Sequence, residues 1–428
     1  MSKRRAVVIS GARTPFVRAF GSYIRKDAIA LGELAVRGLL DRTELSWSEV
    51  DSVVWGGVIL PSGAPNVARE IVLDVGLPHS VEAYTCSRAC ASGLQAVTAA
   101  AAAIERGDAD VVIAGGGDST SNAELKMPQS LVRKVAPVAM SSKSGPMDYF
   151  RLLGKLGWRD LVPRQPRIAE RSTGQLMGEA AEDMAKRHGI SRQAQDAFAA
   201  RSHHRAAEAI ASGRFADEVV PVQLTKDKSV YTDEIVRGTT SEDKLAKLRP
   251  VFSKDGTLTA GNSSALTDGA AAVLLMSEEK ARALGYTPKA AFKSWSYVGV
   301  DPSDQLLMGP AIAMPKALDR CGMSLADVDF IDMHEAFAAQ VLAILRMLGS
   351  DSFAKERLGR DTAVGQVDPS RLNLHGGSVA LGHPFAATGA RMVTTVANEL
   401  HGRGGGTALL GICAAGGIGA AAVLEAIA

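Results

Sequence analysis

The segment CASGLQAVTAAAAAIERGDADVVIAGGG, residues 90–117, contains the pattern that decides the fold. A turn of small residues precedes an alanine-rich, proline-free stretch that predicts a helix over about Ala91–Arg106, ended by Gly107. The run Asp110–Ala114 then predicts a buried strand, which ends in the glycine turn Gly115–Gly117. Together these signals predict one α/β unit with Cys90 at the start of its helix.

The same order of signals recurs near the end of the chain. Gly389 precedes a predicted helix over about 390–401, and a predicted strand over 407–412 ends at the glycine-rich stretch 413–417. Two copies of one α/β unit are therefore expected. In such a pair, the matching helix starts and strand ends can meet at a shared cleft.

Further apolar runs extend this pattern over most of the chain. Strands are expected at Ala6–Ser10, Val53–Ile59 and Ala271–Met276, with helices between them. This alternation favours an α/β fold with a largely parallel, buried sheet. The predicted domains are an N-terminal half over 1–120 to which about 251–280 returns, an inserted, mostly helical loop domain over 121–250, and a C-terminal half over 281–428.

The inserted region contains two segments that have more than one interpretation. Met147–Val162 mixes apolar with basic residues, so a helix packed on its own domain, a partner-binding helix and a membrane-surface helix all remain open. His203 and His204 lie in a predicted solvated helix over 193–212. Adjacent helical residues diverge by about 100°, so we expect two surface histidines rather than a metal site.

The composition narrows the classes of function. The 428 residues are 46% hydrophobic and carry a formal net charge of +2, which argues against nucleic-acid binding. No apolar run approaches the roughly 18 residues of a transmembrane helix, and the N-terminal run is too short for a signal peptide. Four cysteines in a chain of this length favour a reducing compartment. A cytoplasmic location is therefore expected.

Three candidate catalytic side chains lie at the ends of predicted elements: Cys90, His383 and Cys413. At a helix N-terminus a thiol faces unpaired N–H groups, so we expect a lowered pKa for Cys90; an inert buried cysteine is the alternative. His383 precedes Pro384 in a glycine-rich turn, and Cys413 ends a strand. These residue types can supply a nucleophile, its base and a second acid/base. No CxxC pair occurs, so no metal is expected.

A fourth polar cluster follows a predicted strand over 328–331. His334 and Glu335 begin like the zinc motif HExxH, but the fifth residue is Ala338, which excludes that motif. A histidine beside a glutamate at such a turn can position a water molecule or an oxyanion donor.

These motifs resemble those of the thiolase superfamily, and the resemblance extends from end to end. The stretch starting at Cys90 (CASGLQA) is similar to the nucleophile motif, 376–384 (GGSVALGHP) to the histidine motif, and the stretch starting at Cys413 (CAAGGIG) to the second-cysteine motif. His334 and the long insert around 125–170 resemble the β-subunit type of the fatty-acid oxidation trifunctional enzyme. The implied fold is a pair of duplicated α/β halves in a layered αβαβα core with an inserted, mostly helical loop domain.

The resemblance also implies an activity, the thiolytic cleavage of 3-ketoacyl-CoA to acetyl-CoA and a shortened acyl-CoA in β-oxidation. In that scheme His383 activates Cys90, an acyl-Cys90 intermediate forms, and Cys413 protonates the departing enolate. One oxyanion site uses His383 and a water held by His334; the other uses the backbone N–H groups of Cys90 and Ala415. Ala415 stands where the family has glycine, and a backbone N–H survives that change.

Substrate contacts are implied for Met177, Ser264 and Phe337, whereas Leu176 replaces a frequent histidine. Coenzyme A is a substrate in this scheme, and no cofactor is implied. The family implies a homodimer or homotetramer, and a hydratase/dehydrogenase partner subunit is a further option; membrane contact stays open.

Three other functions remain as alternatives. The first is an acetoacetyl-CoA thiolase that works in the condensing direction. The second is a ketoacyl synthase, against which the Cys413 motif argues because those enzymes use Cys-His-His. The third is a lipid-binding or scaffold subunit.

Overall fold

The structure is a computed structural model that describes residues 4–163 and 169–427. The described residues fall into two compact units, one formed by 4–122 with 169–427 and a small one within 123–163. The domain boundaries expected from the sequence stay a prediction. In the described parts of the chain, no helix combines the length and the apolar character needed to cross a bilayer.

The large unit is built on a ten-stranded mixed sheet in the order β10-β11-β12-β9-β1-β8-β5-β3-β4, with β2 paired to β8. The strands are β1 Ala6–Arg13, β2 Val17–Arg18, β3 Ser52–Gly56, β4 Glu82–Cys86, β5 Val111–Asp118, β8 Thr267–Ser277, β9 Ala290–Gly299, β10 Phe330–Met333, β11 Thr407–Ala414 and β12 Ile418–Ala426. A separate hairpin pairs β6 Val222–Thr225 with β7 Lys228–Val230.

The expectation of a largely parallel sheet is wrong. Among the strands of this sheet that the structure describes, β3–β4, β3–β5 and β10–β11 are parallel pairs and the other ladders are antiparallel. One reason is the tight turn between β11 and β12, where Gly416 and Gly417 have φ of +83° and +66°. A turn this short can join only antiparallel strands. Sequence signals locate strands, but the length of each connection sets their directions.

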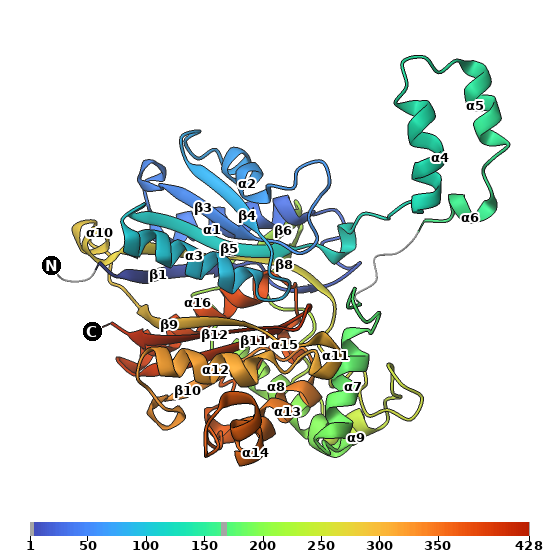
Figure 1. Cartoon of the computed structure of the whole chain (residues 1–428). Helices are drawn as coiled ribbons and strands as arrows, with labels where there is room; N and C mark the ends of the chain where they lie inside the picture. Colours follow the sequence, from blue (N-terminus) through green and yellow to red (C-terminus); the bar gives the residue numbers. More distant parts are fainter. Residues whose placement is uncertain (1–3, 164–168, 428) are drawn as a thin grey trace. The chain divides into compact units, whose positions relative to one another are not determined.

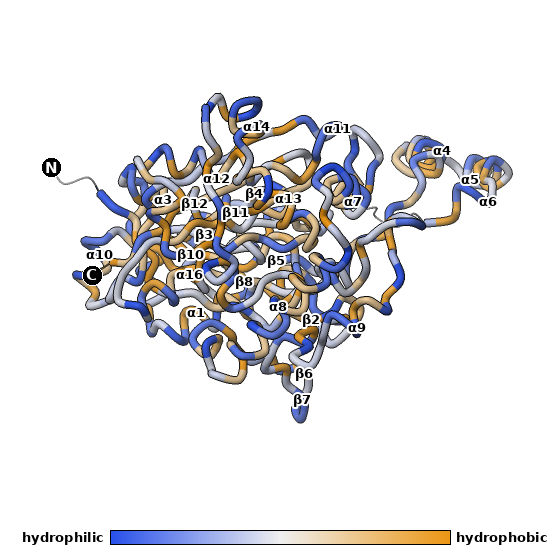
Figure 2. The backbone as a smooth tube through the Cα atoms, turned by 90° about the horizontal axis from the view of Figure 1, so that it is seen from below, coloured by the Kyte–Doolittle hydropathy of each residue, from blue (hydrophilic) through white to orange (hydrophobic). Residues whose placement is uncertain are grey.

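Helices form the other layers of the large unit (Figure 1). Helices α3 and α16 lie between the half of the sheet that contains β1, β3–β5 and β8 and the half that contains β9–β12; their apolar side chains share one core with both halves. Helices α1 and α2 cover the outer face of the first half, and α12 and α13 that of the second. The bounds are α1 Ala28–Thr43, α2 Val67–Val75, α3 Ser92–Arg106, α12 Gly309–Arg320, α13 Ala338–Leu348 and α16 Ala387–Arg403. This is the expected αβαβα layering, and Figure 2 shows hydrophobic residues concentrated along its strands and central helices.

The repeated pattern seen in the sequence corresponds to α3 followed by β5 and to α16 followed by β11. The two central helices approach each other closely because each has a glycine at the contact. A Cβ on Gly93 would overlap the carbonyl oxygen of Ala386, and a Cβ on Gly389 would overlap the backbone nitrogen of Leu94. The two helix starts, and the residues just before them, are thereby held side by side.

The other helices lie outside this duplicated core. In the large unit they are α7 Met177–Arg187, α8 Arg192–Ala211, α9 Glu242–Ala246, α10 Glu278–Ala283, α11 Pro302–Gln305, α14 Asp351–Phe353 and α15 Ser378–Leu381. The small unit contains α4 Gln129–Ala139, α5 Pro146–Leu153 and α6 Trp158–Leu161. A single helix over Met147–Val162 is therefore not formed: Gly154 ends α5 and Gly157 begins α6, as expected from the low helix propensity of glycine.

The two adjacent histidines of α8 have different surroundings. His204 is exposed, as expected, and a ring nitrogen of it bonds to the Thr240 carbonyl. The expectation is wrong for His203, which is buried and accepts a hydrogen bond from the Arg237 N–H at its Nδ1. Burial lowers the pKa of His203 to about 4. The divergence of neighbouring helical positions keeps the two rings apart, as predicted.

Candidate active site

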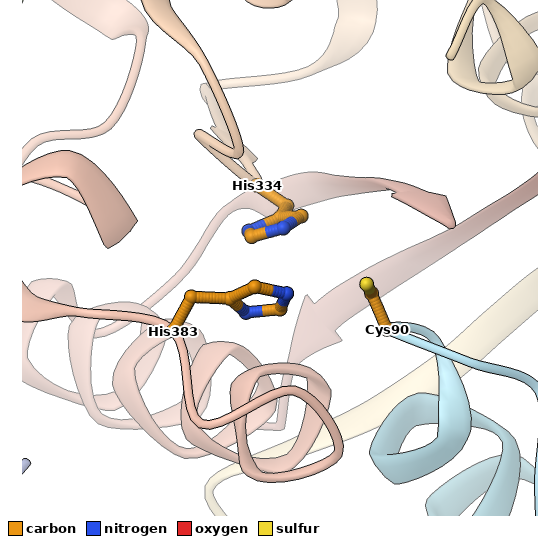
Figure 3. Close-up of side chains that lie close together, drawn as sticks. All are labelled: Cys90, His334 and His383. Atoms are coloured by element: carbon orange, nitrogen blue, oxygen red, sulfur yellow. The ribbon is translucent and has the colours of Figure 1, made fainter. Parts of the chain in front are cut away.

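Three side chains from distant parts of the sequence meet at the start of the two central helices. Cys90 precedes α3, His383 lies in the turn between α15 and α16, and His334 directly follows β10. The Cys90 sulfur and one ring nitrogen of each histidine lie within 4.8 Å of one another (Figure 3). The two imidazole rings are tilted by 41°, with centroids 4.0 Å apart. The predicted residues Cys90, His383 and His334 therefore form one cluster.

Cys90 is placed by a strained turn that the sequence analysis did not identify. The preceding residue, Ala89, has a φ of +46°, which is uncommon for a residue with a Cβ. Ser92 fixes this turn: its hydroxyl accepts from the Arg88 N–H at 2.7 Å and donates to the Ala89 carbonyl at 2.6 Å. The Cys90 residue as a whole is half-buried. Strain held in this way beside a candidate nucleophile is typical of a functional turn.

His383 is oriented through its Nδ1, which lies 2.6 Å from the Thr388 hydroxyl. Its Nε2 is buried and has no hydrogen-bond partner among the described residues. Figure 3 shows a ring nitrogen of His383 turned toward the Cys90 sulfur. Burial lowers the pKa of His383 to about 3, so the ring is neutral and can accept a proton.

His334 has the same arrangement from the other half of the fold. Its Nδ1 lies 2.9 Å from the Ser378 hydroxyl, and its Nε2 has no partner in the described parts of the chain. Burial, with nearby His383 and Arg391, holds its pKa well below the ordinary range. A free, neutral ring nitrogen beside the thiol can bind a water molecule or a substrate oxygen. Cysteine and histidine are also zinc-ligand types, and the expected absence of a metal stays a prediction.

The expectation of a lowered pKa for Cys90 is wrong. Burial raises the pKa of the thiol to about 12, although the N–H of Ala415 and its own N–H both favour the thiolate. Loss of hydration therefore outweighs the helix terminus. The resting site contains a neutral thiol beside a neutral imidazole.

Cys413 lies near the end of β11, and it is close enough to Cys90 for a charge on Cys90 to raise the pKa of Cys413. It is 1% exposed, and burial raises its pKa well above the ordinary value, so this thiol is also neutral. The turn that follows it contains Ala415, whose N–H hydrogen-bonds to the Cys90 sulfur and thereby opposes the rise in the Cys90 pKa. In that turn the Gly416 N–H donates to Glu170 at 2.9 Å, a contact that the sequence analysis did not identify.

Glu335 does not share the role of its neighbour His334. Its carboxylate accepts from the Asn373 amide at 2.6 Å, the Ser202 hydroxyl at 2.7 Å and the Val379 N–H at 3.1 Å. Consecutive residues in extended backbone point in opposite directions, so His334 faces the thiol and Glu335 faces the supporting loops. Glu335 thus ties α8 and the loop before α15 to the strand that carries His334.

Two domain families match the chain almost from end to end. The thiolase N-terminal domain matches residues 6–279, and the thiolase C-terminal domain matches residues 286–426. The chain belongs to the thiolase family.

Named relatives of this thiolase chain are similar over almost their whole length. The 3-ketoacyl-CoA thiolases of Yersinia pestis (strain Pestoides F) and Yersinia pseudotuberculosis serotype O:1b (strain IP 31758) are each 47% identical over 423 residues, covering 98% of this chain and 97% of the relative. Among solved structures, Bacillus anthracis acetyl-CoA acetyltransferase matches with a TM-score of 0.83 at 33% identity, covering 99% of each chain. Human mitochondrial 3-ketoacyl-CoA thiolase in complex with CoA matches with a TM-score of 0.84 at 33% identity, covering 99% of this chain and 98% of that one.

The expected substrate-contacting residues of this thiolase chain lie on segments near the site. Met177 begins α7 and packs in the same apolar cluster as Phe337 and Cys413. Phe337 also packs edge-to-face on Phe252, with centroids 5.7 Å apart. The Ser264 N–H donates to the carbonyl of Ala336, next to Phe337. Their roles in binding CoA, like the oxyanion roles of Cys90 and Ala415, stay predictions.

Proposed function

We propose that this chain is an acyltransferase, a 3-ketoacyl-CoA thiolase that cleaves its substrate with CoA to give acetyl-CoA and a shortened acyl-CoA in β-oxidation. The observation that carries the proposal is the cluster of the Cys90 sulfur with the neutral rings of His383 and His334, whose ring nitrogens lie within 4.8 Å of the sulfur and of each other. The 47% identity to relatives named 3-ketoacyl-CoA thiolase supports the same substrate class.

The first half of the reaction needs a nucleophile and a place for negative charge. As the Cys90 sulfur attacks the 3-keto carbon, its proton passes to the free Nε2 of His383. Charge then develops on the keto oxygen, where the free ring nitrogen of His334 can hold a water molecule as a hydrogen-bond donor together with protonated His383. Donors that are already in place stabilise this charge without reorganisation.

The second thiol completes the carbon–carbon cleavage. When the Cα–Cβ bond breaks, its electron pair forms the enolate of acetyl-CoA, and Cys413 donates a proton to it. Cys413 then takes the proton from the thiol of incoming CoA, whose sulfur attacks the acyl-Cys90 thioester. The bond between the acyl carbon and the Cys90 sulfur breaks, and the Cys90 thiolate takes back the proton from His383. The N–H groups of Cys90 and Ala415 are our candidates for the thioester oxyanion. CoA acts as substrate, and no step requires a cofactor.

The alternative is an acetoacetyl-CoA thiolase that runs toward condensation. The structural similarity to Bacillus anthracis acetyl-CoA acetyltransferase supports this alternative. Every step above is reversible, so the same residues serve both directions, and the acyl chain length separates the two proposals.

The proposal also includes the oligomeric state, a partner subunit and the compartment. We expect a homodimer or homotetramer, with a hydratase/dehydrogenase subunit as a further partner, in a reducing, cytoplasmic setting that fits four free cysteines. The 123–163 unit is the candidate contact surface because its large apolar side chains are exposed, including Met140 at 85%, Trp158 at 80% and Phe150 at 73%. Size-exclusion chromatography with light scattering tests self-association, and co-purification with and without this unit tests the partner.

The test of function is a thiolysis assay with acetoacetyl-CoA and a long-chain 3-ketoacyl-CoA, comparing wild type with Cys90→Ala. Higher kcat/KM on the long chain, lost in Cys90→Ala, is the expected result. Turnover of acetoacetyl-CoA alone would favour the condensing alternative. No Cys90-dependent turnover of either substrate would contradict the proposal.

A further inference from the structure

We propose that Glu170 is a positioning residue for catalysis, which anchors the Gly416 amide and thereby holds the Ala415 N–H in its direction toward Cys90. The inference rests on the proposed thiolase function, because the Ala415 N–H matters only if Cys90 is the nucleophile. It adds a role for the segment that follows the 123–163 unit in sequence.

Both carboxylate oxygens of Glu170 accept hydrogen bonds. Its Oε2 accepts from the Gly416 N–H at 2.9 Å. Its Oε1 accepts from the N–H and the hydroxyl of Ser172, at 3.1 and 2.8 Å. Glu170 as a residue is 9% exposed. Bonds to an ionised carboxylate are about twice as strong as neutral ones, so this anchor is firm.

The anchor is itself held in a closed turn of backbone. The Glu170 N–H donates to the Gln175 carbonyl and the Gly174 N–H to the Glu170 carbonyl, both at 2.8 Å. Ala169 pairs with Leu176 across the same turn. The turn leads directly into α7 at Met177, a predicted substrate contact. Glu170 therefore connects the α7 segment with the loop after Cys413.

The loop that contains Gly416 has a flexible backbone, so a hydrogen bond that fixes it matters. Gly416 is exposed and has a φ of +83°, and glycine gives the backbone its widest freedom. On its far side, the Gly417 carbonyl is held by the Val300 N–H at 2.7 Å. The Gly416 N–H and the Ala415 N–H belong to the peptide planes on either side of the Ala415 Cα. Fixing the first plane therefore limits rotation of the second.

The consequence for the reaction is a measurable loss of rate. Removing one oxyanion-hole donor costs about 10²–10³-fold in kcat, and a donor that is only loosened should cost less. We expect Glu170→Ala to lower kcat about 10-fold, with KM for the acyl substrate within about 2-fold of wild type. Glu170→Gln keeps an oxygen that can accept from Gly416, so it should recover most of the rate.

A matched variant separates the anchor from a merely structural role of the turn. Ser172→Ala removes the partner hydroxyl at the other carboxylate oxygen and leaves the Gly416 bond in place. We expect it to retain near wild-type kcat. Equal losses in Ser172→Ala and Glu170→Ala would overturn the proposal, because the effect would then belong to the 170–175 turn. A rise in KM at unchanged kcat would also overturn it.

A second readout needs no turnover. The Ala415 N–H favours the Cys90 thiolate, so the rate of Cys90 alkylation by iodoacetamide at fixed pH should fall severalfold in Glu170→Ala and stay unchanged in Ser172→Ala. Peptide mass spectrometry assigns the alkylated cysteine. An unchanged alkylation rate in Glu170→Ala would overturn the anchor. If the wild type fails to cleave 3-ketoacyl-CoA, the proposed function fails, and the alkylation result still decides whether Glu170 positions the loop.

Discussion

Two glycines that pair in the sheet pack against the segments that carry Cys90 and His383. Gly56 of β3 pairs in register with Gly116 of β5. A Cβ on Gly56 would stand 2.6 Å from the Ser92 carbonyl carbon and 2.8 Å from the Gly93 nitrogen, at the start of α3. A Cβ on Gly116 would stand 2.5 Å from the Ala386 carbonyl oxygen, in the turn that follows His383. We predict that Gly56→Ala pushes Cys90 away from His383.

The size of the displacement follows from these contacts. Ordinary van der Waals contact for a Cβ begins near 3.4 Å, so the Ser92 carbonyl carbon would have to retreat by most of an ångström. The three atoms nearest to that Cβ are backbone atoms of Ser92 and Gly93, so no flexible side chain can move away in their place. Overpacking of this kind costs about 1–3 kcal/mol, and a misplacement of about 1 Å can cost about 10²-fold in rate. We expect Gly56→Ala to lower kcat about 10- to 100-fold while the protein still folds.

The assay combines thiolysis kinetics with thermal melting, and Gly402→Ala is the matched control. Gly402 also lies within a central-layer element, α16, but a Cβ there would meet nothing within 4 Å. Replacing an open helical glycine with alanine should stabilise the protein by about 1 kcal/mol and leave kcat unchanged. Wild-type kcat and Tm in Gly56→Ala would refute the claim that this contact sets the position of Cys90.

Two further predictions concern stability. His203 accepts from the Arg237 N–H only when its ring is neutral, and burial lowers its pKa in the folded protein to about 4, against an ordinary 6.5. The free energy of unfolding should therefore fall as pH drops from about 6.5 toward 4. In urea denaturation, His203→Asn should reduce this pH dependence, whereas His204→Asn should leave it unchanged. Asp233→Ala should lower the free energy of unfolding by about 3–5 kcal/mol in the same assay. It removes the carboxylate that accepts two hydrogen bonds from the fully buried Arg13, at 2.7 and 2.9 Å. A loss no larger than that of the exposed control Asp243→Ala would contradict this.

The features that could be predicted from the sequence are those fixed by local pattern. The run 90–117 contains its own start, stop and strand signals, so α3 appears where expected and β5 begins where expected. The expected glycine turn is wrong, because β5 continues through Gly115–Gly117 to Asp118, where these glycines pair with β8. The prediction of strand direction was wrong because direction depends on how distant segments pair. The strand β8, for example, lies between β1 and β5 and runs antiparallel to both. The predicted exposure of His203 was wrong for the same reason. Its partner Arg237 lies outside α8, so the periodicity of that helix does not identify the contact.

The residues of the candidate site also fall into those that could be predicted from the sequence and those that could not. Cys90, His383 and His334 could be named because small residues and element ends mark them in the sequence. The supporting residues Ser92, Asn373 and Glu170 could not, since a serine, an asparagine or a glutamate acquires such a role only through a three-dimensional contact. Asn373, for example, has a φ of +49° and joins Met333 to Glu335, which lie far from it in sequence. Local sequence therefore identifies the reacting groups better than the groups that aim them.

The protonation state of the site leads to a last prediction. Burial raises the pKa of Cys90 to about 12 and lowers that of His383 to about 3, so proton transfer between them is unfavourable in the free protein. A preformed thiolate–imidazolium pair would be alkylated by iodoacetamide at a rate that levels off at low pH. A neutral pair would instead give a rate that rises with pH across the accessible range, because only the thiolate reacts.

We therefore expect Cys90 of the free protein to react slowly near neutral pH, with no plateau on the acid side. A plateau below about pH 6 would contradict the neutral pair. Cys321→Ser is the control, because it removes a partly buried thiol on α12's C-terminal end and should leave the Cys90 profile unchanged. Slow reaction with a general alkylating agent, beside fast turnover of a 3-ketoacyl-CoA, would mean that the thiol loses its proton only as the substrate's carbonyl takes up the charge. The burial that opposes a free thiolate would then protect the nucleophile between turnovers.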